Sequence, residues 1–111
     1  DQWGSPTLAS DLAAAVLVAA RSELRGTVHM AGPENLDRLS FARRTAAALG
    51  FDSVVVEGIA TVELSQAARR PLRAGLLSSS SVAELGLQLC GIDEGLVHVR
   101  ADMEAAAVAG V

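Results

Sequence analysis

Lysine and tyrosine are both absent from this sequence of 111 residues, and all nine of its cations are arginine. Chemistry that requires a Lys–Tyr pair, a Schiff-base lysine or a P-loop lysine is therefore excluded from the chain. Aromatic residues are limited to Trp3, Phe41 and Phe51. The single cysteine, Cys90, can form neither an internal disulfide nor a thiolate metal cluster. We expect it to be a buried small apolar residue rather than a reactive thiol.

The charge balance and the hydropathy pattern restrict the possible partners. The net charge is −4, and no basic stripe runs along the chain. This balance argues against nucleic acid, although arginine can still bind an anionic ligand locally. No segment approaches the roughly 18 uninterrupted apolar residues of a membrane helix, and no basic stretch precedes an apolar leader. We therefore expect a cytoplasmic chain that has no membrane partner.

A strand–turn–helix pattern in residues 26–50 is the centre of the predicted fold. Residues Thr27–Met30 are short, mostly apolar and partly β-branched, which is typical of a strand. Asp37 is a good N-cap for a following helix, and Gly50 is a good C-terminal stop. Apolar residues at helical spacing predict an earlier helix over Leu8–Ser22. The alternation of helix and strand predicts an α/β unit with helices packed on a few short strands.

Four further segments complete the predicted order of elements. Val54–Val56 is the strongest strand signal because it contains three consecutive β-branched residues. Ile59–Ala68 favours a short helix or a turn. A serine run precedes a short helix over Val82–Leu87, for which Ser81 is the expected cap. Asp93 is the expected cap of a last helix that ends in an alanine-rich tail. Much of the hydrophobic content is alanine, so the core is expected to be thin.

Common catalytic and cofactor motifs are missing from the sequence. There is no GxGxxG phosphate loop, no GxSxG nucleophile elbow and no HExxH metal motif. Arg69 and Arg70 precede Pro71, which forces extended backbone at Arg70, so both guanidinium groups are candidates for binding a phosphate. An exposed surface kink explains this pair equally well. Three more arginines, at positions 38, 43 and 44, fit a solvated helix face better than a phosphate site.

Four segments resemble one known family in the order in which they occur. DQWGSPTLASDLA resembles a DQ-x-G-x-PT-x-x-x-DLA stretch, and GTVHMAG resembles a G-x-x-H-x-x-G strand. LDRLSFARRTAAALG resembles an S-x-x-EFA helix, with Asp37 and Ser40 in place of the usual serine and glutamate. ARRPLRAGLLSSSSVAELGL resembles an RP-x-x-S-x-L-x-x-x-K segment that lacks the usual serine and lysine. The chain is therefore similar to the C-terminal part of extended short-chain dehydrogenase/reductases, in the dTDP-4-dehydrorhamnose reductase branch.

The resemblance implies a division of labour within a larger reductase. In the family, an N-terminal Rossmann half binds NADPH or NADH and carries the Tyr-x-x-x-Lys catalytic set, whereas the later part forms most of the sugar-nucleotide pocket. Residues 1–111 resemble that later part as a single, partial Rossmann-like unit, with no catalytic residues and no cofactor or metal site of their own. The family pattern places Arg70 against the nucleotide diphosphate. It places Gln2 and Trp3 beside the substrate cleft.

The expected activity of the parent enzyme is hydride transfer to the C4 keto group of a dTDP-4-keto-6-deoxyhexose, and this chain alone is expected to be inactive. A non-catalytic sugar-nucleotide-binding or regulatory module of the same fold is the alternative. A third interpretation is a stable fragment, in which the predicted strand Thr27–Met30 lacks the strands it would pair with, so its exposed edge predicts homo-oligomers or aggregation.

Overall fold

The computed structural model describes residues 1–110, which form four α-helices, two 3-10 helices and a small two-stranded sheet. The elements along the chain are β1 (Trp3–Gly4), α1 (Ala9–Arg21), β2 (Leu36–Asp37), α2 (Arg38–Ala48), η1 (Ser53–Val55), η2 (Thr61–Leu64), α3 (Ser79–Glu84) and α4 (Ile92–Ala109). The predicted mixed α/β class is confirmed: helices surround a few very short strands. Within residues 1–110, no helix is long and apolar enough to cross a membrane.

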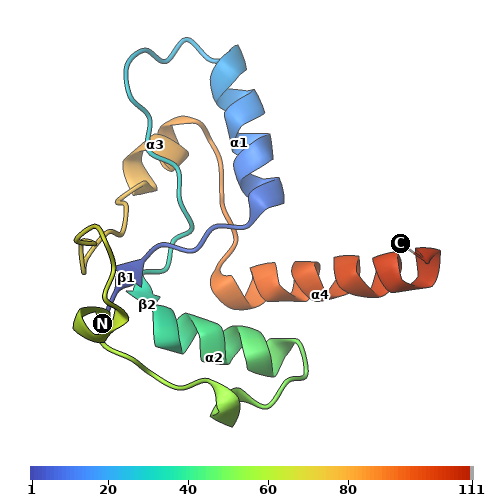
Figure 1. Ribbon diagram of the computed structural model, residues 1–111. Coiled ribbons are helices and arrows are strands. Elements are labelled where there is room, and N and C mark those ends of the chain that lie inside the picture. The colour runs from blue at the N-terminus through green and yellow to red at the C-terminus, as the bar shows by residue number, and fades with distance from the viewer. Residues whose placement is uncertain (111) are drawn as a thin grey trace.

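The sheet lies at the junction of the helices and is built around the start of the chain. Strands β1 and β2 pair antiparallel, with Trp3 opposite Asp37 and Gly4 opposite Leu36. In Figure 1 this sheet lies beside the first turn of α2, while α1 and α4 extend away from it in different directions. The N-terminus is therefore close to the sheet, and the C-terminus lies at the far end of α4.

The predicted helices are present, although two of the predicted caps are wrong. Asp37 caps α2 by accepting a hydrogen bond from the backbone N–H of Ser40 at 2.8 Å, and Gly50 follows the helix with a φ of 81°. Helix α3 starts at Ser79, three residues before the predicted start, so Ser81 lies inside it rather than capping it. Helix α4 starts after Gly91, which places Asp93 in its first turn rather than at its cap.

Both predicted strands are wrong. Thr27–Met30 has no regular secondary structure, and Val54 and Val55 belong to the 3-10 helix η1, where their exposed fractions are 80% and 74%. Strand propensity expresses how well a side chain fits a paired, half-buried surface. Neither segment has a neighbouring strand within the described residues, so the propensity is not realised. The expected pairing of chains along an exposed edge at Thr27–Met30 consequently loses its structural basis.

The core is thin, as alanine-rich helices led us to expect. The buried apolar residues are Ala15, Ala31, Leu89, Ile92 and Leu96. The radius of gyration is 16.5 Å, whereas a compact domain of this length has one of about 13 Å. Large apolar side chains such as Leu17, Val62 and Leu77 remain more than half exposed. The described residues therefore form an open structure in which much apolar surface has no cover.

Hydrogen bonds between distant segments hold this open structure together. The backbone N–H of Cys90 donates to the Asp11 carboxylate at 2.8 Å, which ties α1 to the segment before α4. The hydroxyl of buried Ser78 donates to the Ala31 carbonyl at 2.8 Å. The Arg44 guanidinium binds the carboxylates of Glu34 at 2.9 Å and Asp93 at 2.7 Å, and so links α2 to α4.

Candidate functional site

The backbone of Trp3 is held on both sides, which fixes the start of the chain in the middle of the molecule. On one side it pairs with Asp37 of β2. On the other, its N–H donates to the Leu72 carbonyl at 2.7 Å and its carbonyl accepts from the Ala74 N–H at 3.1 Å. These bonds form a parallel bridge between Trp3 and Arg73. Residues from the first, second and third parts of the chain therefore meet at this one residue.

A hollow of about 560 Å³ lies beside this meeting point, and we call it the arginine hollow. Within the described residues 1–110, its only charged lining residues are Arg38 and Arg70. Its lining also includes two of the three aromatic residues of the chain, Trp3 and Phe41, and two amide side chains, Gln2 and Gln66. The combination of two guanidinium groups with flat apolar rings suits a ligand that has an anionic group and a ring system.

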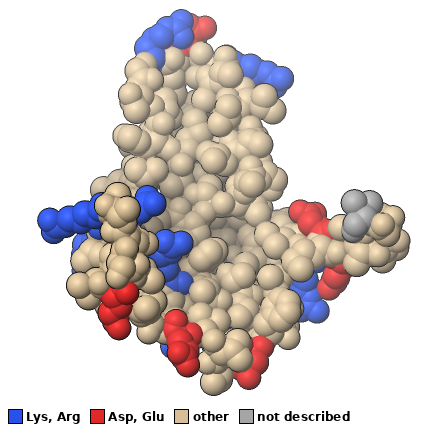
Figure 2. All heavy atoms as spheres, in the orientation of Figure 1, with Lys and Arg blue, Asp and Glu red and all other residues tan. Residues whose placement is uncertain are grey.

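The three residues singled out in the sequence, Gln2, Trp3 and Arg70, all line the arginine hollow. They come from two segments almost seventy residues apart, and the bridge between Trp3 and Arg73 brings those segments together. Figure 2 shows arginine atoms gathered over the same region of the surface, where β1 and the segment after η2 lie. The structure therefore places the predicted residues at one site, although their contact with a ligand stays a prediction.

A cation–π contact fixes one neighbour of the Trp3 ring. The guanidinium carbon of Arg73 lies 5.5 Å from the ring centroid. The Trp3 residue is 37% exposed, so part of its ring remains open to solvent. Such a contact at an exposed position contributes about 0.5–1 kcal/mol and restrains both side chains. The Trp3 ring is thus partly exposed to solvent, and both its backbone and Arg73 hold it in place.

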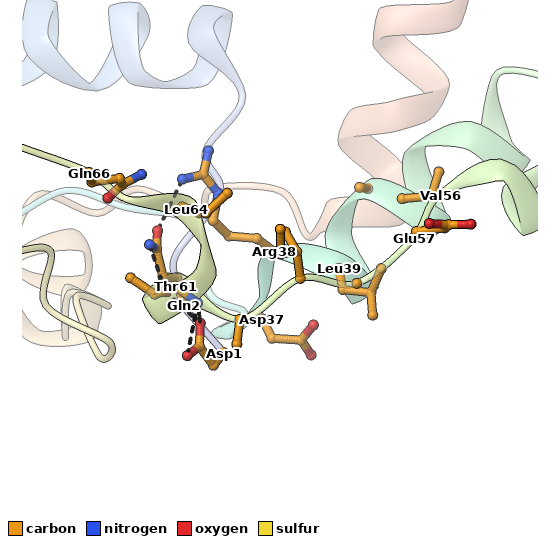
Figure 3. A pocket seen from close by; sticks show the side chains of 14 residues that line it. Asp1, Gln2, Asp37, Arg38, Leu39, Val56, Glu57, Thr61, Leu64 and Gln66 are labelled. Atoms are coloured by element: carbon orange, nitrogen blue, oxygen red, sulfur yellow. Dashed lines mark hydrogen bonds between the residues drawn. The ribbon is translucent and has the colours of Figure 1, made fainter.

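The side chain of Gln2 is engaged on both ends by other protein groups. Its amide nitrogen donates to the Thr61 hydroxyl at 3.0 Å, and its amide oxygen accepts from the Arg38 guanidinium at 3.1 Å. The backbone N–H of Arg38 also donates to the Gln2 carbonyl, at 2.9 Å. Figure 3 shows the resulting arrangement, in which the Arg38 guanidinium extends past Gln2 toward Gln66. Gln2 therefore joins the start of α2 to η2.

A second hollow, of about 630 Å³, adjoins the first and shares Gln2, Arg38 and Gln66 with it. Figure 3 views this hollow, which we call the acidic hollow. Its lining includes three carboxylates, those of Asp1, Asp37 and Glu57. The Asp1 carboxylate accepts hydrogen bonds from Thr61, and the Asp37 carboxylate accepts them from Ser40. The two neighbouring hollows thus differ in the sign of their charge.

No metal centre is evident in the part of the chain that the structure describes. Across residues 1–110, no three histidine, cysteine or acidic side chains are grouped as metal ligands. The lining of the arginine hollow contains no serine–tyrosine–lysine constellation, since the sequence has neither tyrosine nor lysine. The two arginines of this hollow remain protonated at all ordinary pH values, so they do not act as an acid or base.

Comparison with known proteins decides the family. The family model described as "RmlD substrate binding domain" matches residues 1–105. The chain belongs to this family. The match spans the whole of the arginine hollow and most of α4, so the resemblance found in the sequence motifs is confirmed. No curated protein and no solved structure matches the chain significantly.

Sequence reasoning missed Arg38, Phe41 and Gln66 as lining residues of the site. The helix pattern predicts a solvated face for Arg38, together with Arg43 and Arg44. Arg43 donates to the Val56 carbonyl and Arg44 forms ion pairs, so each of those two has a structural partner. Arg38 differs because β2 pairs with β1 directly before α2 begins. No local signal in the sequence indicates that pairing.

Proposed function

We propose that this chain is the sugar-nucleotide-binding part of a reductase similar to dTDP-4-dehydrorhamnose reductase. The parent reaction would reduce the C4 keto group of a dTDP-linked 4-keto-6-deoxyhexose with NADPH or NADH, in the cytoplasm. One observation carries the proposal: in a chain of a substrate-binding family, Gln2, Trp3 and Arg70 line a single hollow that has two arginines and two aromatic rings. A nucleoside diphosphate offers the matching charge and ring system.

The two hollows suit different parts of such a ligand. The Arg70 guanidinium can bind diphosphate oxygens with two parallel hydrogen bonds, and the Trp3 and Phe41 rings offer apolar faces to a base. The carboxylates of the adjoining acidic hollow accept hydrogen bonds, which suits the hydroxyl groups of a sugar and repels phosphate. Charge alone therefore gives the ligand a preferred direction along the combined hollows.

Hydride transfer requires groups that this chain does not supply. A nicotinamide dinucleotide is held by a glycine-rich loop at a helix N-terminus, and the sequence has no such motif. We therefore propose that cofactor binding and proton transfer belong to a separate Rossmann half. The exposed apolar side chains of α1, among them Val16 and Leu17, are consistent with cover by another chain segment or by a second copy.

A thermal-shift titration with dTDP, dTDP-rhamnose and NADPH tests the proposal. Ligands that bind only the folded state raise the midpoint of unfolding. We expect an increase with both dTDP compounds and none with NADPH. An NADPH-dependent reduction of a keto sugar by the purified chain would overturn the assignment of an inactive binding part, and the absence of any shift would contradict a preformed sugar-nucleotide site.

The alternative is a binding module with no catalytic role in any parent protein. The lack of tyrosine and lysine is compatible with both assignments. The region encoded upstream of Asp1 distinguishes them. A glycine-rich loop followed by Tyr-x-x-x-Lys favours the reductase, whereas an upstream region without them favours the non-catalytic module.

A further inference from the structure

The arginines of this chain divide into those with a structural carboxylate or carbonyl partner and those without one. Arg44 binds Glu34 and Asp93, Arg100 binds Glu104, and Arg43 donates to the Val56 carbonyl. Among residues 1–110, neither Arg38 nor Arg70 forms an ion pair. Both line the arginine hollow, whose lining among the described residues contains no carboxylate, although Arg38 also lines the acidic hollow. Two guanidinium groups that line one hollow can both contribute to binding an anion there.

Arg38 occupies a distinctive position between the two hollows. It lines both of them, as do Gln2 and Gln66. Arg70 lines the arginine hollow and a third hollow of about 510 Å³, which Arg69 also lines. Arg38 and Arg70 therefore both line the arginine hollow, and each also lines a different second hollow.

The Gln2 side chain restrains the Arg38 guanidinium at this boundary. The hydrogen bond from Arg38 to the Gln2 amide oxygen uses one of the five N–H donors of the guanidinium and leaves the others available. Gln2 is itself fixed by its hydrogen bond to the Thr61 hydroxyl, which also donates to the Asp1 carboxylate. Figure 3 shows this chain of contacts from Asp1 through Thr61 and Gln2 to Arg38. A held guanidinium loses less conformational entropy on binding than a free one.

The carboxylate nearest to Arg38 in the sequence binds other groups instead of the Arg38 guanidinium. Asp37 precedes it, but its two oxygens accept hydrogen bonds from the backbone N–H and the hydroxyl of Ser40, at 2.8 and 2.7 Å. These bonds lower the pKa of Asp37, so it stays ionised, and they direct the carboxylate to the first turn of α2. Within residues 1–110, the Arg38 guanidinium donates its hydrogen bond to the Gln2 amide oxygen instead.

We propose that Arg38 is a second diphosphate-binding residue beside Arg70 in the arginine hollow, and that Gln2 is a positioning residue that acts through Arg38 rather than through the ligand. This inference rests on the proposed function, because it takes the diphosphate of a nucleotide sugar as the anion. It reassigns Gln2 from the substrate contact expected from the family resemblance to a support for Arg38. It also predicts that both arginines of the arginine hollow bind the ligand.

The test is a calorimetric titration of the 111-residue chain with inorganic pyrophosphate, dTDP and thymidine. Replacing Arg38 by alanine is expected to weaken the binding of pyrophosphate and of dTDP about tenfold, because a charge-assisted hydrogen bond contributes about that factor to the affinity. The affinity for thymidine should be unchanged. R38K keeps the positive charge but loses the planar guanidinium that can form two parallel hydrogen bonds. It should therefore recover only part of the affinity. R100A is the matched control, because it removes an arginine from α4, away from the hollow.

A double-mutant cycle tests the role of Gln2. Q2A should weaken the binding of dTDP several-fold in the wild-type background and should not change it in the R38A background. An equal loss in both backgrounds would show that Gln2 contacts the ligand, which overturns its positioning role.

If R38A binds dTDP as tightly as wild type, the inference fails while the proposed function stands. If the wild-type chain binds pyrophosphate but not dTDP, and R38A abolishes that binding, the nucleotide assignment fails while the anion site stands. If the wild type binds neither ligand, both fail.

Discussion

The carboxylate of Glu34 accepts a hydrogen bond from the backbone N–H of Ile92, with 2.6 Å between Oε1 and the nitrogen. Ile92 is the first residue of α4, and Gly91, which precedes it, has no side chain that can cap the helix. The other oxygen of Glu34 binds Arg44 of α2 at 2.9 Å. One carboxylate therefore caps α4 from a distance of 58 positions in the chain and joins it to α2.

Replacing Glu34 by alanine should lower the free energy of unfolding by about 1 kcal/mol, because it removes a helix cap whose side chain is partly solvated. Chemical denaturation measures this change. E34Q keeps an oxygen that can accept the hydrogen bond from the Ile92 N–H, so its free energy of unfolding should decrease less. E104A is the control, since Glu104 also lies in an arginine pair but caps no helix. An E34A variant as stable as E104A would contradict the capping role.

Stability should fall in acid through the same carboxylate. The pKa of Glu34 is lowered, first by the hydrogen bond from Arg44 and then by that from the Ile92 N–H. The pKa of Asp11 is lowered chiefly by the backbone N–H of Cys90. A carboxyl group whose pKa is lower in the folded state stabilises that state fully above its unfolded pKa, and the contribution disappears as the pH falls through the folded pKa.

We therefore expect the contribution of these two groups to the free energy of unfolding to be constant above about pH 5. It should decrease as the pH falls below about 4. Denaturation curves recorded from pH 3 to pH 7 measure it. The double variant E34Q/D11N should show a smaller decrease over this range than the wild type, because neither amide titrates. An unchanged slope in the double variant would assign the acid sensitivity to other carboxylates.

Local sequence signals predicted the helices better than the strands, and the reason is physical. Asp37 and Gly50 delimit α2 through contacts within a few residues, so their effect can be read from the sequence. The strand propensity of Val54–Val56 depends on a paired neighbour, which residues 1–110 do not provide. The two strands that do form contain Trp3 and Leu36, in segments with no strand pattern. Their pairing depends on contacts between distant parts of the chain.

The candidate site was predictable to a similar extent. Family-like motifs singled out Gln2, Trp3 and Arg70, and all three line the same hollow. Arg38 escaped notice because its location follows from the pairing of β1 with β2, and because the helix pattern grouped it with Arg44. The hydrogen bond between Gln2 and Arg38 joins residues 36 positions apart, which no periodicity argument can supply.

Gly32 is predicted to tolerate no larger residue. A Cβ atom at this position would lie 2.2 Å from the carbonyl oxygen of Pro6, which is a backbone atom and cannot rotate away. The Gly32 N–H also donates to the Thr7 hydroxyl at 3.0 Å, so the two segments are in close contact. G32A should therefore destabilise the fold by about 1–3 kcal/mol through overpacking. Thermal unfolding measures the change. G4A is the control, since a Cβ at Gly4 meets nothing within 4 Å, and an equal loss in both variants would contradict the close approach.

Cys90 should be unreactive toward alkylating agents at neutral and mildly alkaline pH. Burial, followed by the nearby Asp11 carboxylate, raises the pKa of its thiol from 9.0 to about 11. At pH 8 roughly one thiol in a thousand is then ionised, compared with about one in ten at the ordinary value. Iodoacetamide should modify the folded chain at least about 100-fold more slowly than the urea-unfolded chain. D11N should accelerate the reaction of the folded chain. Equal rates for folded and unfolded chains would refute the raised pKa.

The same thiol predicts a loss of stability in alkali. Because its pKa is raised in the folded state, its contribution is fully present below the unfolded value of 9.0 and is lost as the pH rises toward about 11. C90S removes this titration. Its free energy of unfolding should therefore change less than that of the wild type between pH 8 and pH 10.5. A wild-type curve that stays parallel to the C90S curve would exclude the contribution.

Trp3 is the only tryptophan, and it lines the arginine hollow, so its fluorescence should report on ligand binding directly. Titration with dTDP should change the emission intensity, because a base against the ring or a phosphate beside Arg73 alters its surroundings. R70A should raise the concentration needed for half of the change by about tenfold or more, since Arg70 lacks a carboxylate partner within residues 1–110 and is expected to bind the diphosphate. R25A is the matched control, because Arg25 pairs with Glu23 and does not line the arginine hollow. If dTDP changes the emission equally in R70A and R25A, the ligand approaches the ring without Arg70, and the diphosphate role of Arg70 is wrong.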